Sequence, residues 1–196
     1  AEERSGMVRF LNPIAAEVVS IVANVLCADG AQIIAGQPDY PRCLQVDITI
    51  ATNPITDGDV TIVGVGASGE ALNEVIDITT AISAVFETDY AYATVTSVTV
   101  SGLAGGAGAG DNIGVGVSSK LGLCGCKSPV PSAWAVYKTI VDDADEAVAG
   151  VDTTYGTVDP TTAPNGAHDY DFWYTFTVTP TQNSHVHGPG THTHLI

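Results

Sequence analysis

The residues best suited to metal chemistry lie near the C-terminal end of the chain, where two His-x-His pairs bracket a Gly-Pro-Gly-Thr segment. The histidines are His185, His187, His192 and His194. In an extended chain, residues i and i+2 point to the same side, so each pair can present two imidazoles to one ion. Imidazole suits zinc, nickel, copper or iron, and one pair from each of three chains would supply six nitrogens. The spacing indicates either a transition-metal site or a solvated histidine-rich tail.

Four cysteines form the second group with metal-binding or redox chemistry: Cys27, Cys43, Cys124 and Cys126. Four thiolates could in principle hold zinc, but paired ligands of structural zinc sites are usually two to four residues apart. Cys27 and Cys43 are much further apart than that, so we expect buried free thiols or one disulfide. Four cysteines allow three disulfide pairings, and the sequence does not choose among them.

Groups that could act in catalysis are few. His168 is the one histidine outside the tail, and no Gly-x-Ser-x-Gly elbow occurs in the sequence. Asp169 and Asp171 could share a strand face, but nothing in the sequence supplies a partner for them. The two Gly-Val-Gly segments at 64–66 and 114–116 lack the lysine of a phosphate loop. We therefore expect that the chain is not an enzyme and has no cofactor beyond the metal considered above.

Composition narrows the class of partner. The chain has 196 residues, of which 45% are apolar and 14% charged, with 22 acidic residues against 6 lysines plus arginines and a net charge of −16. Nucleic-acid binding depends on cations that neutralise phosphates, so we expect no nucleic-acid partner. An anionic membrane surface would repel the chain, and no apolar run is long enough to span a bilayer.

The dominant pattern along the chain is an alternation of apolar and polar residues, which is typical of β-strands. It is clearest at 44–50, 113–117, 134–141 and 170–178. In the third segment we expect Trp134, Val136, Lys138 and Ile140 to share one face. Turn-rich residues separate such runs at intervals that indicate antiparallel hairpins. These features predict an all-β fold, either an antiparallel β-sandwich or a jelly-roll-like barrel.

Three segments follow from this pattern. Residues 1–17 are expected to be an extended N-terminal arm, with a frayed terminus as the alternative. Residues 18–180 are expected to form the β-sandwich domain, with a subdivision near 127–132 left open because the composition shifts there. Residues 181–196 form the histidine-rich tail. The arm holds Arg4 and Arg9 in an otherwise acidic chain, so we assign partner binding to Arg4, Arg9 and Phe10.

Several stretches give the chain a family resemblance. They are Gln-Pro-Asp-Tyr-Pro-Arg at 37–42 before an alternating strand, the hairpin-like 60–66 and 74–80, and residues 92–100, 110–116, 120–123 and 156–160. Over about 37–179 the chain resembles structural proteins encoded in the head gene clusters of tailed bacteriophages. The resemblance implies a place in the virion more than a mechanism. The cysteines and the histidine tail are not features of that class.

These observations lead us to expect a capsid decoration, or cement, protein on the outer surface of a phage head. Its partners would be the major capsid protein and further copies of itself, expected as a trimer. One alternative is another virion position: a head fibre, tail tube or tail tip. A second alternative is a carbohydrate-binding or adhesion module, in which Trp134, Tyr155 and Trp173 would stack on sugars.

Overall fold

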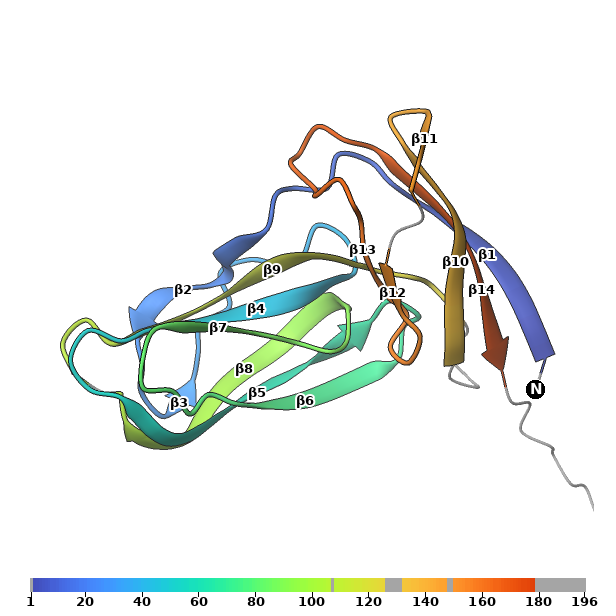
Figure 1. Ribbon diagram of the computed structural model, residues 1–196. Coiled ribbons are helices and arrows are strands. Elements are labelled where there is room, and N and C mark those ends of the chain that lie inside the picture. Colours follow the sequence, from blue (N-terminus) through green and yellow to red (C-terminus); the bar gives the residue numbers. More distant parts are fainter. Residues whose placement is uncertain (1, 107, 126–131, 148–149, 179–196) are drawn as a thin grey trace, which may run out of the picture.

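A computed structural model describes residues 2–106, 108–125, 132–147 and 150–178 of the chain (Figure 1). This part of the protein contains fourteen strands and no helix, so none of the described residues forms a helix that could cross a bilayer. The all-β prediction is therefore confirmed. The strands form a β-sandwich and an attached four-stranded sheet, and the described strands do not close into a barrel.

The sandwich has two antiparallel layers, which lie one above the other in Figure 1. The first has the order β2 (Glu17–Leu26), β9 (Asn112–Gly122), β4 (Arg42–Thr49) and β7 (Ala84–Glu87). The second has the order β3 (Gly30–Ala31), β8 (Tyr92–Gly105), β5 (Ile55–Gly66) and β6 (Ala71–Asp77). A single residue pair, Arg42 with Tyr92, joins β4 to β8 and makes the layers one continuous sheet.

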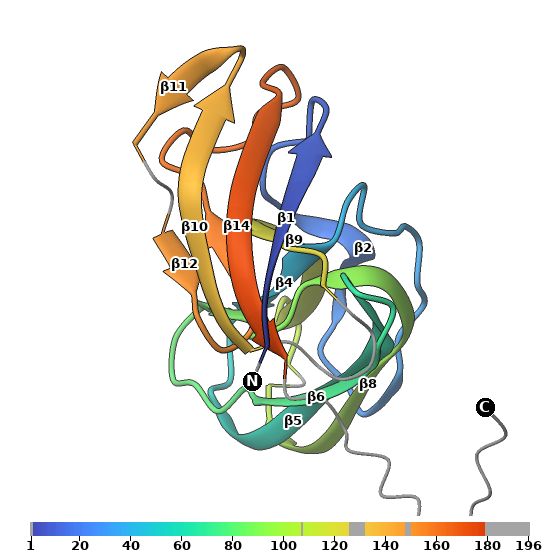
Figure 2. The same ribbon diagram turned by 90° about the vertical axis from the view of Figure 1, so that its right-hand side faces the viewer.

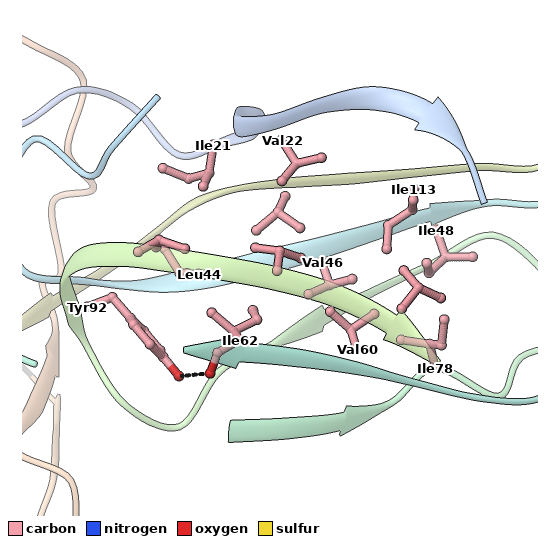
Figure 3. Close-up of a cluster of buried hydrophobic side chains, with 14 of the residues drawn as sticks. Ile21, Val22, Leu44, Val46, Ile48, Val60, Ile62, Ile78, Tyr92 and Ile113 are labelled. Atoms are coloured by element: carbon pink, nitrogen blue, oxygen red, sulfur yellow. Dashed lines mark hydrogen bonds between the residues drawn. The ribbon is translucent and has the colours of Figure 1, made fainter. Parts of the chain in front are cut away.

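The sandwich core lies between these layers (Figure 3). Leu44, Val46 and Ile48 alternate along β4 and are fully buried, as the period of two predicts. They face Val60 and Ile62 of β5 across the core. Burying each such aliphatic side chain stabilises the fold by about 1.5–3 kcal/mol, so this core dominates the stability of the sandwich.

Two glycines of β9 let β2 approach closely. A Cβ atom on Gly116 would lie 1.6 Å from the carbonyl oxygen of Glu17, and one on Gly114 would lie 2.9 Å from Val19 Cγ1. A side chain at either position would therefore push β2 away from β9. The Gly-Val-Gly segment at 114–116 thus serves backbone packing.

The second sheet has the order β1 (Glu2–Phe10), β14 (Tyr170–Val178), β10 (Ser132–Val141) and β11 (Ala144–Glu146). Figure 2 looks onto its outer face, with β10, β14 and β1 side by side. Its inner face carries an aromatic core that packs against Leu121, Leu123 and Val158 at the end of the sandwich. Val158 belongs to β13 (Thr157–Asp159), which pairs with β12 (Gly150–Asp152) and with the end of β9.

The N-terminal segment needs a correction. Over Glu2–Phe10 the expected arm is strand β1, paired with β14 along its whole length without a register shift. Val8 and Phe10 explain this placement, because they alternate onto the inner face and extend the aromatic core of β14. The polar residues at 2–5 mask that pattern in the sequence. Of the expected arm, the described residues 2–17 are therefore not separate from the folded domain.

The division considered near 127–132 does not separate two sheets. Residues 126–131 lie outside the described part, but the strands on either side mix: β1 joins β10, β11 and β14 in one sheet, whereas β12 and β13 join the sandwich strands. The chain therefore passes between the two sheets more than once. The last described strand ends at Val178, and the predicted boundary at 180 lies outside the described residues.

A β-bulge changes the faces expected for β10. The register shifts between Val136, opposite Tyr174, and Lys138, opposite Trp173, which leaves Tyr137 as the extra residue. Trp134 and Val136 are buried as expected, but Lys138 lies on the outer face and Thr139 is buried. The expected grouping of Trp134 and Val136 with Lys138 and Ile140 is therefore wrong beyond residue 136.

Candidate interaction surface

The outer face of the four-stranded sheet is the most distinctive surface among the described residues. Met7 of β1, Trp173 of β14 and Lys138 of β10 lie in one row across the three strands, because Met7 and Lys138 are both register partners of Trp173. The ammonium of Lys138 lies 5.4 Å from the centre of the Trp173 ring, within range of a cation–π interaction. We call Met7, Tyr137, Lys138 and Trp173 the outer-face patch.

The outer-face patch exposes apolar side chains that a sheet face would usually cover. Met7 is 54% exposed and Tyr137 55% exposed. The bulge in β10 contributes to this exposure, because it turns both Tyr137 and Lys138 outward. Aromatic residues and methionine are enriched in protein interfaces, and cations at the rim add electrostatic selectivity. The patch is therefore suited to binding another protein surface.

Arg9 and Asp171 form an ion pair at one end of this face. Arg9 Nε donates to Asp171 Oδ1 at 2.6 Å, and Arg9 Nη2 donates to Asp171 Oδ2 in a second bond. The Asp171 side chain is 8% exposed and that of Arg9 55% exposed. Hydrogen bonding to Asp171 and the charge of that carboxylate raise the pKa of Arg9 further above its ordinary value. Arg9 thus neutralises a nearly buried carboxylate.

A small cavity of about 120 Å³ lies beside this ion pair. It is lined by Arg9, Ile140, Asp142, Asp143, Asp169 and Asp171. Asp142 and Asp143 make the two-residue turn between β10 and β11, each with positive φ. Asp142 accepts hydrogen bonds from the Asp169 amide at 2.9 Å and from His168 Nδ1 at 2.6 Å, and these lower its pKa. In the described residues, no group of three or more His, Cys, Asp or Glu side chains is arranged to hold a metal ion.

The three residues assigned to partner binding have different surroundings. Phe10 is 1% exposed and contacts Tyr40 and Phe172, so its assignment to partner binding is corrected: it belongs to the core. Arg4 pairs with Glu2 at 3.3 Å on the exposed start of β1. Arg9 reaches the surface while paired with Asp171. The sequence analysis placed Arg4 and Arg9 on an extended arm, whereas both lie on strand β1, which is paired with β14.

The predicted metal-binding groups are distributed as follows. His185, His187, His192 and His194 lie outside the described residues, as does Cys126. Cys27 and Cys43 are buried free thiols, and Cys124 is an exposed free thiol. The free state of the two buried cysteines agrees with one of the two expectations for them.

The aromatic residues considered for sugar stacking are separated. Trp134 is 4% exposed and packs on Tyr174 and Phe176, so it belongs to the core. Tyr155 packs edge-on against Tyr90, with their ring centres 4.7 Å apart. Trp173 alone of the three lies in the outer-face patch. The sequence analysis did not identify Met7 and Tyr137 as its neighbours. Tyr137 lies at a bulge and Met7 lies on an edge strand that begins with polar residues, so neither belongs to a clear alternation of apolar and polar residues.

Comparisons of the chain with protein-family models, with curated proteins and with solved structures found no match.

Proposed function

We propose that this protein is a virion structural protein, specifically a decoration protein that binds the outer surface of a tailed-phage head and stabilises it. The observation that carries the proposal is the outer-face patch, an apolar and aromatic surface with a cation on a chain of net charge −16. The resemblance of residues 37–179 to phage head proteins supports the choice of partner. The partner is then the major capsid protein, and the location is the outside of the capsid.

The mechanism follows from the arrangement of the two sheets. The sandwich is held together by its aliphatic core, and no described strand covers the outer face of the four-stranded sheet at its end (Figure 2). Docking this face over a junction between capsid subunits would bury Met7 and Tyr137 and hold the subunits together. The acidic sandwich would then face solvent, where its net charge opposes aggregation of decorated heads.

The test is decoration of phage heads assembled without this chain. We expect wild-type protein to bind such heads saturably and to raise the temperature at which they release DNA. Tyr137→Ser should lower the affinity for heads at least about fivefold, because an interface aromatic often contributes more than 1 kcal/mol. Val75→Ser is the matched control, since Val75 is 59% exposed on β6 of the sandwich.

Two outcomes would count against the proposal. If wild-type protein binds no heads of the virus that encodes it, the function is wrong. If wild type, Tyr137→Ser and Val75→Ser bind equally, the docking face is wrong. Thermal melts of both variants show whether any loss of binding reflects unfolding.

A further inference from the structure

Among the described strands, β1 has a partner at only one of its two edges. It pairs with β14 on one side from Glu2 to Phe10, and no other described strand pairs with it. Its nine residues contain no proline and no bulge, so the free edge is long and regular. Unpaired N–H and C=O groups on such an edge are a template for another strand. A partner strand is therefore the natural occupant of this edge.

We propose that the free edge of β1 pairs antiparallel with β1 of a second copy of this chain, across a two-fold axis at Gly6. The inference does not depend on the proposed function. In place of the trimer expected from the sequence, it gives a dimer in which the two four-stranded sheets form one continuous sheet.

The register follows from the strand itself. The joined sheet keeps its inner and outer faces only if even-numbered residues of one β1 lie opposite even-numbered residues of the other, and odd-numbered residues opposite odd-numbered ones. Centring the pair on Gly6 puts Glu2 opposite Phe10 and uses the whole strand. Centring it on Ser5 or Met7 shortens the overlap to residues 2–8 or 4–10. Complete overlap therefore selects the Gly6 register.

Charge selects the same register independently. On the outer face, Glu3 stands at one end of β1 and Arg9 at the other, and both are exposed. In the Gly6 register each Glu3 lies opposite Arg9 of the second copy. The other two registers place Glu3 opposite Met7 or Leu11. An edge protected by like charges would repel itself, whereas these opposite ends attract across the two-fold axis.

Apolar contact adds to the pairing. Met7 of one copy lies diagonal to Met7 of the other, and each has Trp173 on its other side. The pairing therefore buries an exposed methionine and joins the two outer-face patches into one strip.

Repulsion between the acidic copies and a small contact area limit the strength of this dimer. Each copy carries a net charge of −16, and the copies repel each other. At physiological ionic strength the Debye length is about 8 Å, so distant charges are largely screened. A single strand pair buries less surface than a standard interface, so we expect a concentration-dependent dimer.

The first test is sedimentation equilibrium of the full chain over a concentration series at about 0.15 M salt, the physiological ionic strength. Wild type should show a monomer–dimer equilibrium. Glu3→Lys should weaken it about tenfold or more, because two exposed attractions become two repulsions. Asp59→Lys makes the same change in net charge on exposed Asp59 of β5, and should leave dimerisation at least as strong as in wild type.

Disulfide trapping tests the register. In the proposed pair, Ser5 of one copy lies opposite Met7 of the other, at a separation that a disulfide spans. A mixture of Ser5→Cys and Met7→Cys chains should therefore cross-link more than either variant alone. The wild type gives the background from Cys124, which is exposed. Position 6 is unsuitable, because a Cβ there would lie 2.8 Å from the Tyr174 ring.

The outcomes separate cleanly. A wild-type monomer at every concentration, or a dimer that Glu3→Lys and Asp59→Lys affect equally, overturns the proposal. Equal cross-linking of mixed and single variants overturns the Gly6 register. Head decoration by a monomeric protein would leave the proposed function standing while this inference fails, and a dimer that binds no heads would do the reverse.

Discussion

The guanidinium of Arg9, on the first strand, binds the nearly buried carboxylate of Asp171 on the last strand through two parallel hydrogen bonds. The two residues are 162 positions apart in the chain and are register partners between β1 and β14. This pair links the N-terminal segment to the strand at the centre of the four-stranded sheet. It also explains how a carboxylate is tolerated at 8% side-chain exposure.

Removing one partner of this ion pair should lower the stability of the fold more than removing both partners. Arg9→Ala leaves the Asp171 carboxylate without its cation, so we expect the thermal midpoint to fall by roughly 3–8 °C. Asp171→Asn combined with Arg9→Ala should recover part of that loss. Calorimetry on the two single variants and the double variant measures the coupling. Additive effects in this cycle would show that the pair contributes nothing specific.

Asp111 should make the stability of the sandwich depend on pH in the acidic range. Its carboxylate accepts backbone N–H bonds from Ala51, Thr52, Asn53 and Gly108 at 2.7–3.1 Å. These bonds, that from Thr52 above all, lower the pKa of Asp111 below its ordinary value. A carboxyl with a lowered pKa in the folded state stabilises the fold at neutral pH. That contribution declines as pH falls below the unfolded value of about 3.9 toward the folded one.

Asp111→Asn should therefore lower the thermal midpoint by roughly 5–10 °C at pH 7, and by less at pH 3. Asp57→Asn, at an exposed position of β5, is the control and should change the midpoint little at either pH. A gap between Asp111→Asn and wild type that is equal at both pH values would contradict the role of the carboxylate charge.

The alternation of apolar and polar residues correctly predicted the strands in which it is uninterrupted. Prediction from the sequence failed where contacts between distant residues decide which side chains are buried. Strand β14 shows its buried face directly, since every second residue from Tyr170 to Val178 is apolar and buried. On its inner face, strand β1 has only two apolar side chains, Val8 and Phe10. Two are too few to identify a strand that also carries several charged residues. The bulge at Tyr137 is set by the pairing with β14, so alternation alone assigns Lys138 to the wrong face.

The candidate surface was predicted less well than the fold. Arg9 was assigned to partner binding, which stays a prediction, and its ion-pair partner Asp171 is defined by strand pairing rather than by spacing. Trp134 and Trp173 look alike in the sequence, both lying in alternating runs. Only the packing of β10 and β14 on the sandwich decides that Trp134 is buried and Trp173 faces outward.

Gly116 should be among the least replaceable positions of the sandwich. Gly116→Ala would place a methyl carbon 1.6 Å from the Glu17 carbonyl oxygen, so β2 must move or part from β9. We expect a loss of about 3 kcal/mol or more in the free energy of unfolding, at the upper end for single substitutions. Gly150→Ala is the matched control, because a Cβ there meets no atom of the described residues within 4 Å. Equal urea midpoints for the two variants would refute the close approach of β2.

The cysteines should differ sharply in reactivity. Burial raises the pKa of Cys43 to about 12, and burial also raises that of Cys27, so at pH 8 both thiols are protonated and inaccessible. Cys124 is exposed, although partial desolvation raises its pKa too. In native protein at pH 8, iodoacetamide should therefore modify Cys124 at least about tenfold faster than Cys27 or Cys43, because the accessible thiolate is the reacting species. Peptide mass spectrometry over a time course measures the rates, and labelling in urea supplies the control in which all thiols react. Rapid native labelling of Cys43 would mean that the start of strand β4 opens far more readily than its burial implies.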